Sequence, residues 1–181
     1  RPGTVLLGNH LKQGGAAAAP EGRGGANGQN QTANPRAQSK PPGGHLAASL
    51  STLAADANRP DFAILYYPVI SFDNMTTHGG SKKNLLGTDI ENKELVDRYS
   101  LQKQVDDKTP KTLLLLSDDD QTVPPLNSIL YYTALNEHHI PASLYMFPSG
   151  GHGWGFRYDF TYYQEVKDLI QKWLTYIKIT D

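Results

Sequence analysis

The sequence predicts an α/β protein built on a parallel sheet, from residue 43 to the C-terminal end. Two continuous apolar runs, at residues 62–69 and 112–116, are typical of strands that are buried on both faces. Stretches with helical periodicity lie before, between and after these runs. The resulting order of helix, strand, insert, strand, helix, strand and helix is the alternation of an α/β fold with parallel strands.

The first predicted element is a helix over residues 44–56. This stretch is rich in helix formers, and Leu46, Leu50 and Leu53 repeat at the spacing of one helix face. A proline, Pro60, separates the predicted helix from the first apolar run.

The remaining predicted elements alternate along the chain: a polar, irregular insert at 73–109 with one short helix at 94–104, a strand at 112–116, a helix at 125–138, a strand at 142–147 and a helix at 160–177. The helix at 125–138 has Ile129, Leu130 and Leu135 on one side. The last helix is amphipathic, with an apolar stripe made of Val166, Leu169, Ile170, Trp173 and Ile177.

Residues 1–42 form a low-complexity segment unlike the rest of the chain. Residues 16–25 have no period of either 2 or 3.6, and residues 27–42 are dominated by Gln, Asn, Ala, Pro, Lys and Arg. One short apolar run, Val5-Leu6-Leu7, is followed at once by Gly8. Such a segment cannot bury enough apolar surface to offset its chain entropy. We therefore expect disorder and no strand before residue 43.

Composition narrows the possible functions. The 181 residues carry a formal net charge of −1, which suits one domain and indicates neither a nucleic-acid partner nor an anionic membrane surface. The absence of cysteine excludes disulfides, thiolate metal sites and a cysteine nucleophile. No apolar run approaches the roughly 20 residues that span a bilayer. No signal core is visible at the N-terminus, so the chain is compatible with a mature or truncated form, and its compartment stays open.

Two polar loops follow predicted strands. Residues 117–124 come after the strand at 112–116 and contain three consecutive aspartates, and His152 lies between glycines after the strand at 142–147. Alone, a run of aspartates is most often a solvated turn, and a histidine between glycines is an ordinary loop residue as often as a functional one. Together, an acid after one strand and a histidine after the next follow the order of a hydrolase catalytic triad. The carboxylate would orient the imidazole and stabilise its protonated form.

Several stretches carry a family resemblance: Gly43-Gly44-His45-Leu46-Ala47-Ala48, Tyr66-Tyr67-Pro68-Val69-Ile70, Gly80-Ser81, Asn84-Leu85-Leu86-Gly87, Asp119-Asp120-Gln121-Thr122-Val123-Pro124, Asn127-Ser128 and Gly150-Gly151-His152-Gly153-Trp154-Gly155. In these, residues 43–181 resemble the C-terminal part of α/β-hydrolases of the acetyl xylan esterase type and of related lipase-like and dienelactone-hydrolase-like enzymes. The resemblance implies that Asp120 is the triad acid and His152 the base, with Asp118 and Asp119 as structural neighbours. It implies no cofactor and no metal.

The chain departs from the family at the nucleophile. In the family, Gly-Gly-His-Leu directly follows the nucleophile elbow, so the resemblance implies Gly-x-Ser-Ala before Gly43. Here Pro41 stands at the serine position and has no hydroxyl group. Pro42 stands where a backbone N–H helps to hold the oxyanion, and proline has none. Ser39 is two residues away on a tight turn, so we do not expect it to replace the missing nucleophile.

Two other histidine motifs have simpler interpretations. His78-Gly79-Gly80 resembles an oxyanion loop, but it follows the elbow position and lies in the insert, so we interpret it as unrelated to the oxyanion. His138 and His139 end a predicted helix, where positive charge is favourable, and no carboxylate cluster accompanies them to hold a metal.

The sequence becomes family-like only at Gly43, which lies inside the elbow motif. We therefore hypothesise that residues 1–42 are not the native N-terminal sequence. A frameshift, mis-splicing or misprediction of the coding sequence would produce such a boundary. The rest of the chain, residues 43–181, would then be the C-terminal part of an α/β-hydrolase domain, whose sheet ends in an unpaired edge.

Three functions are compatible with the sequence. The first, by lineage, is a serine carboxylesterase that deacetylates an acylated, xylan-like carbohydrate, with that small substrate as its partner and neither nucleic acid nor membrane. The second is an inactive fragment or pseudoenzyme, with a sugar-contacting surface near Trp154, Tyr158 and Tyr162, although packing is the favoured role of these side chains. The third is a serine peptidase of the same fold. The resemblance also implies that relatives are often secreted or periplasmic.

Overall fold

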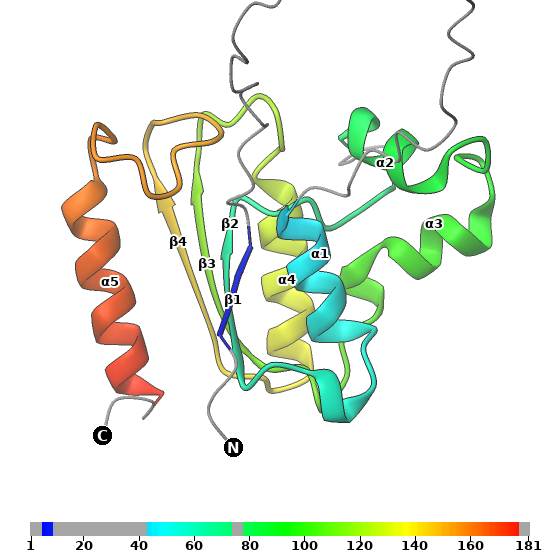
Figure 1. Ribbon diagram of the computed structural model, residues 1–181, viewed down its shortest axis with the longest axis horizontal. Coiled ribbons are helices and arrows are strands. Elements are labelled where there is room, and N and C mark those ends of the chain that lie inside the picture. The colour runs from blue at the N-terminus through cyan, green and yellow to red at the C-terminus, as the bar shows by residue number, and fades with distance from the viewer. Residues whose placement is uncertain (1–4, 9–42, 74–77, 178–181) are drawn as a thin grey trace, which may run out of the picture.

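A parallel sheet of four strands, in the order β1–β2–β3–β4, forms the centre of the fold (Figure 1). The computed structural model describes residues 5–8, 43–73 and 78–177. The strands are β1 (Val5–Gly8), β2 (Phe62–Tyr66), β3 (Lys111–Ser117) and β4 (Ala142–Phe147). The predicted α/β fold with a parallel sheet is thus confirmed.

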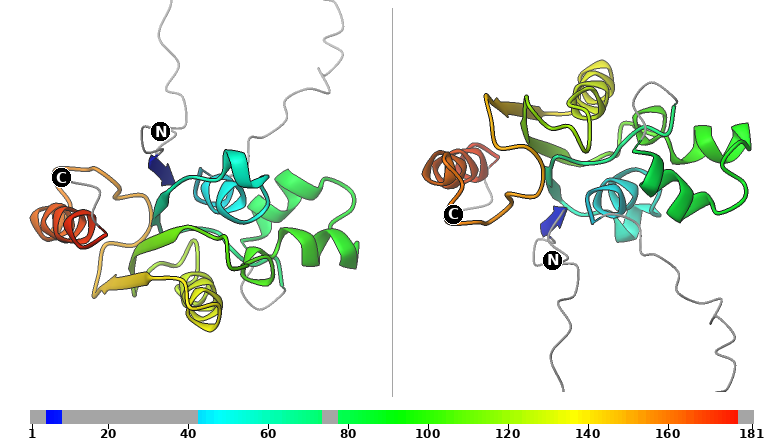
Figure 2. Two further views of the ribbon diagram at one scale, coloured as in Figure 1. Left: turned by 90° about the horizontal axis from the view of Figure 1, so that it is seen from below. Right: turned by 90° about the horizontal axis from the view of Figure 1, so that it is seen from above.

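Helices cover both faces of this sheet. They are α1 (Gly43–Thr52), α2 (Gly79–Leu86), α3 (Lys93–Tyr99), α4 (Leu126–Glu137) and α5 (Tyr163–Tyr176), with short 3-10 turns at Asp56–Asn58 and Leu101–Lys103. The first and fourth helices lie on one face and α5 on the other, while α2 and α3 extend to the side of α1 (Figures 1 and 2). Among the described helices, none is both long enough and apolar enough to cross a membrane.

The central strands bury both of their faces, as their continuous apolar runs predict. Successive side chains of β2 point to opposite sides of the sheet, so Phe62 and Ile64 pack toward α5 while Ala63 and Leu65 pack toward α1 and α4. Strand β4 is only partly buried, because it lies at the edge of the sheet. A third apolar cluster, under α2 and α3, is formed by Val69, Phe72, Leu86 and Val123.

Strand β1 contradicts the expectation that no strand precedes residue 43. Val5 to Gly8 pair in parallel with Phe62 to Leu65, so the edge of β2 that was expected to be open carries a further strand. The free backbone groups of an edge strand provide partners even for a short extended segment, and four residues suffice here. The predicted disorder of the rest of residues 1–42 lies outside the described residues.

The predicted apolar faces of two helices are wrong in detail. In α1, Leu46 and Leu50 are 44% and 36% exposed, while Ala47 and Ala48 are buried against the sheet. In α4, Ile129 is 39% exposed, and the buried side is formed by Asn127, Ser128, Tyr131, Ala134 and Leu135. In both helices the face that packs on the sheet is thus made largely of residues other than the predicted Leu and Ile. The spacing of large apolar residues alone does not identify that face. The apolar stripe of α5 does face the sheet.

The insert contains one helix more than predicted. The unpredicted helix, α2, begins after His78, whose Nδ1 accepts a hydrogen bond from the Ser81 N–H at 3.1 Å. The predicted helix at 94–104 is α3, which is capped by Asn92 and ends at Tyr99 before a 3-10 turn. Short polar helices of this kind depend on their caps more than on an apolar stripe.

An ion pair joins the end of α1 to the connection before β3. The Arg59 guanidinium group donates to both carboxylate oxygens of Asp106, with Nη2 at 2.8 Å from Oδ2. It also donates to the carbonyl oxygens of Thr52, at 2.9 Å, and Ala54, at 3.1 Å. The Arg59 side chain is only 10% exposed, and hydrogen bonding to it lowers the pKa of Asp106 from 3.8 to about 2.

We predict that Asp106→Asn lowers the free energy of unfolding at neutral pH by about 1 to 3 kcal/mol, because the nearly buried arginine loses its charged partner. The folded-state pKa of Asp106 lies below its unfolded value, so this stabilisation is present above pH about 4 and is lost as pH falls toward about 2. Urea unfolding between pH 7 and pH 2 measures both effects.

Asp107→Asn is the matched control, since the Asp107 side chain is 92% exposed. The control should retain the stability and acid sensitivity of the parent chain. Equal losses in the two variants would contradict the role assigned to the Arg59–Asp106 pair.

Candidate active site

The loop after β3 holds a buried carboxylate. Asp120 is 4% exposed, and its Oδ1 accepts hydrogen bonds from the backbone N–H groups of Thr122 and Val123, both at 2.9 Å. Its Oδ2 lies 2.8 Å from His152 Nδ1. Asp120 and His152, the two site residues predicted from the sequence, thus lie in contact, each in the loop that follows one of two adjacent strands.

The environment of Asp120 favours its ionised form. Burial alone would raise the pKa of the Asp120 carboxyl group, but hydrogen bonds from His152, Val123 and Thr122 together outweigh this effect and lower it. An ionised carboxylate only accepts hydrogen bonds, so Nδ1 of His152 must carry the proton in their contact. In the neutral ring, Nε2 is then the nitrogen with the free lone pair, and it can act as a base.

The His152 ring is held between the carboxylate and an aromatic side chain. The ring of Tyr67, the first residue after β2, lies 4.4 Å from the imidazole between centroids. Burial raises the pKa of Tyr67 to about 12, so its hydroxyl stays protonated at neutral pH. Tyr67 has φ = 34°, which is unusual for a residue other than glycine. The His152 side chain nevertheless remains 28% exposed, against 1% for Asp120.

The glycines around His152 give its loop a path that other residues could not follow easily. Gly150, Gly151, Gly153 and Gly155 all have positive φ, which is free of steric cost only for glycine. At Gly150, moreover, a Cβ atom would lie 2.4 Å from Phe160 Cε2 and 3.0 Å from Ser117 Oγ. The loop is therefore pressed against the core immediately before the histidine.

Trp154 belongs to the core. It is 2% exposed, stacks on Phe160 with ring centroids 4.1 Å apart, and donates from Nε1 to Ser117 Oγ at 2.8 Å. Tyr162 stacks on Phe147 at 5.1 Å, whereas Tyr158 is 86% exposed. Of the three aromatic residues considered for a sugar-contacting surface, two thus pack within the fold.

A buried amide connects the insert to the aspartate loop. Asn127 Oδ1 accepts from the backbone N–H groups of Ile70 and Ser71, both at 3.0 Å. Its Nδ2 donates to the Pro124 carbonyl oxygen at 3.1 Å. Asn127 and Tyr67 both stand in family-like stretches of the sequence, but no role was predicted for either. For Tyr67 the signal was position, because it directly follows a buried strand; Asn127 lies in the first turn of α4 and had no such signal.

The other histidines have structural contacts. His45 is 1% exposed, lies parallel to Phe72 at 4.8 Å and contacts the Tyr99 carbonyl oxygen at 3.0 Å through Nε2. His78 caps α2, accepting from the Ser81 N–H. His138 pairs with Asp107 at 3.2 Å. Within the described part of the chain, no group of three or more potential metal ligands is found.

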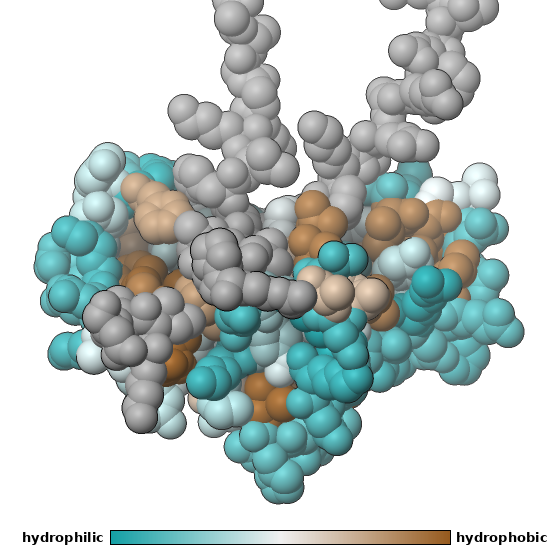
Figure 3. All heavy atoms as spheres, turned by 60° about the horizontal axis from the view of Figure 1, so that its bottom comes forward, coloured by the Kyte–Doolittle hydropathy of each residue, from teal (hydrophilic) through white to brown (hydrophobic). Residues whose placement is uncertain are grey.

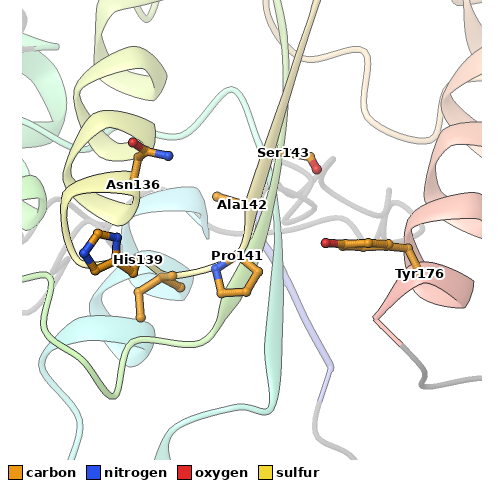
Figure 4. Close-up of a pocket in the computed structure, with 7 residues that line it drawn as sticks. Asn136, His139, Pro141, Ala142, Ser143 and Tyr176 are labelled. Atoms are coloured by element: carbon orange, nitrogen blue, oxygen red, sulfur yellow. The ribbon is translucent and has the colours of Figure 1, made fainter.

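A hollow of about 500 Å³ lies at the opposite end of the sheet from Asp120 and His152. It surrounds the start of β4, with Asn136 and His139 on one side and Tyr176 on the other (Figure 4). Hydrophilic residues predominate over this end of the molecule, and hydrophobic residues form separate patches there (Figure 3). The hollow therefore has no part in the arrangement around His152.

Among folds with a parallel sheet, an acid and a histidine on successive loops at the carboxyl edge are the arrangement of the α/β-hydrolases, and this is the class that fold and site define here. The family follows from the sequence. Residues 43–176 match the prolyl oligopeptidase family, and the chain belongs to that family. The positions of Pro41, Pro42 and Ser39 lie outside the described residues.

Two relatives have names that refer to xylan. The chain is 38% identical over 135 residues to an acetylxylan esterase of Xylanibacter ruminicola, a match that covers 73% of this chain and 28% of that protein. It is 43% identical over 97 residues to endo-1,4-beta-xylanase B of Butyrivibrio fibrisolvens, covering 54% of this chain and 15% of that protein. The chain thus spans only a minor part of each relative.

The chain spans about half the length of the solved structures that share its fold. An acetyl ester-xyloside bifunctional hydrolase of Caldicellulosiruptor lactoaceticus superimposes with a TM-score of 0.71 at 38% identity, over 77% of this chain and 55% of that one. A sugar hydrolase of Lactococcus lactis does so with a TM-score of 0.57 at 26% identity, over 75% and 57%.

We predict that Gly150→Ala destabilises the fold by about 2 to 4 kcal/mol, because it combines a strained backbone with a direct clash against Phe160. Gly151→Ala is the control: its φ is also positive, but no atom lies within 4 Å of the added Cβ, so the loss should be about 1 kcal/mol. Urea unfolding of both variants tests the difference, and equal losses would show that the clash is relieved.

Proposed function

We propose that Asp120 and His152 are the acid and base of a serine-type ester hydrolase that deacetylates acylated, xylan-like carbohydrate. The observation that carries this proposal is the 2.8 Å contact between the buried Asp120 carboxylate and His152 Nδ1, which leaves Nε2 as the basic nitrogen. The name of the relative that is 38% identical, acetylxylan esterase, supports the substrate class.

In this mechanism His152 transfers a proton in each of two steps. Its Nε2 takes the proton of a serine hydroxyl as that oxygen attacks the acetyl carbonyl carbon, and the imidazolium then protonates the departing sugar alcohol. Water attacks the acyl-enzyme in the second step, with Nε2 again taking and returning the proton. Asp120 stays ionised throughout, fixes the ring and stabilises the imidazolium.

The chain as printed lacks the residue that this relay would activate. Proline occupies both the serine position and the following oxyanion position, at Pro41 and Pro42. Ester hydrolysis is therefore the activity we propose for the lineage from which the site derives. For this chain itself, an inactive fragment or pseudoenzyme is the second candidate. The non-native origin of residues 1–42 would reconcile the intact Asp120–His152 pair with the missing serine.

The origin of residues 1–42 can be tested on the encoding DNA. A second reading frame that supplies Gly-x-Ser-Ala ahead of Gly43 would support the hypothesis. A single intact frame, with full coverage across the boundary, would refute it.

A peptidase is the third candidate, favoured by the name of the family to which the chain belongs. Neither the aspartate loop nor the histidine loop distinguishes an ester from an amide substrate. The esterase is preferred because both the 38% identical relative and the 38% identical solved structure bear the names of acetyl ester hydrolases.

We predict that the purified chain hydrolyses a chromogenic acetyl ester no faster than buffer, since no serine stands at the elbow. His152→Ala should leave this background unchanged. Measurable turnover by the chain that disappears in His152→Ala would show instead that another hydroxyl serves as nucleophile.

We predict activity once a nucleophile elbow with its serine is supplied. A chimera in which residues 43–181 replace the matching segment of the Xylanibacter ruminicola esterase should release acetate from acetylated xylan. Within it, His152→Ala should lower kcat by about 10³-fold or more, whereas His138→Ala, which alters an exposed histidine at the end of α4, should not. A folded chimera that cleaves peptide anilides but no acetyl ester would favour the peptidase.

A further inference from the structure

Asp119, the residue before the proposed acid, fastens the histidine loop. Its Oδ1 accepts a hydrogen bond from the Gly151 N–H at 2.8 Å, and its Oδ2 accepts one from the Gly150 N–H at 3.2 Å. Each carboxylate oxygen thus binds one of two consecutive backbone groups. Consecutive N–H groups that converge in this way form a small anion-binding concavity, and here a side chain of the neighbouring loop fills it.

The contacts between the two loops run in parallel. Asp119 and Asp120 are adjacent in one loop, and Gly151 and His152 are adjacent in the other. The first residues of the two pairs are in contact, because the Gly151 N–H donates to the Asp119 carboxylate. The second residues are in contact too, through the 2.8 Å hydrogen bond between Asp120 and the imidazole of His152. Fixing Gly151 against Asp119 therefore sets the distance at which the next residue, His152, faces Asp120.

Asp120 itself is held independently of Asp119. Its Oδ1 is bound by two N–H groups of its own loop, those of Thr122 and Val123, so the carboxylate has a fixed position without the histidine. Within the histidine loop, the described backbone hydrogen bonds lie after His152, from the Arg157 N–H to Trp154 and from the Phe160 N–H to Arg157, and the loop's glycines allow other backbone paths. Of the two partners, His152 is the one whose place depends on an outside contact.

We propose that Asp119 is a positioning residue for the base: its carboxylate holds the Gly150–Gly151 backbone so that His152 Nδ1 stays within hydrogen-bond distance of Asp120. This inference rests on the proposed function for its catalytic meaning, but not for its geometry. It predicts that loss of the Asp119 carboxylate loosens the imidazole while the sheet and its helices stay intact.

Global stability and ring position should respond differently to this change. Asp119 is exposed, so removing its side chain opens no cavity in the core. The effect should be confined to the loop that it binds. A purely structural role would instead lower the free energy of unfolding without affecting the His152 proton before the chain unfolds.

The test is NMR on the full ¹⁵N-labelled chain, with the His152 Nδ1–H proton identified by its absence in His152→Ala. In Asp119→Ala we expect exchange of this proton with water to become at least tenfold faster, together with the amide protons of Gly150 and Gly151. Asp119→Asn keeps one acceptor oxygen and should restore part of the protection. Asp118→Ala, which alters the adjacent exposed aspartate, should leave all three rates unchanged.

The outcomes separate the two proposals. Unchanged exchange of the His152 proton in Asp119→Ala, in a folded chain, overturns the positioning role and leaves the proposed function standing. Equal acceleration in Asp118→Ala also overturns it, because the effect would then reflect loop charge in general. A parent chain in which the His152 proton exchanges as fast as that of a free imidazole would count against the Asp120–His152 pair, and hence against the proposed function.

Discussion

The parallel pairing of β3 with β4 is the constraint on which the site depends. The two strands end in register, with Ser117 opposite Phe147, so the loops that follow begin side by side. A backbone hydrogen bond from Asp118 to the Phe147 carbonyl oxygen, at 2.8 Å, extends the alignment by one residue. Asp120 and His152 then meet through a contact between the two loops, with Asp120 Oδ2 2.8 Å from His152 Nδ1.

Those features that depend on local sequence were predictable. Strand β4 matches its predicted bounds, residues 142–147, and the apolar runs of β2 and β3 marked strands buried on both faces. The Asp120–His152 contact followed from the same logic, because polar residues after adjacent parallel strands gather at one edge of the sheet. Asp120 was singled out among three aspartates by family resemblance alone, since nothing in the spacing distinguishes it from Asp118 or Asp119.

Features that depend on a neighbouring surface were not predictable. Strand β1 is four residues long and exists as a strand because β2 offers it an edge. Leu46 and Leu50 are exposed because α1 packs on the sheet through Ala47 and Ala48 instead. The Asp119 contact with the glycine loop joins residues more than thirty positions apart, and no local pattern announces it.

Asn127 fixes the start of the segment that connects β2 to β3. Its side-chain amide accepts hydrogen bonds from Ile70 and Ser71, where the chain leaves the sheet, and donates one to the carbonyl oxygen of Pro124. The segment also packs on the aspartate loop, because Phe72 and Leu86 share an apolar cluster with Val123, whose N–H binds Asp120. A change in how the segment packs would therefore reach the Asp120 carboxylate through Val123.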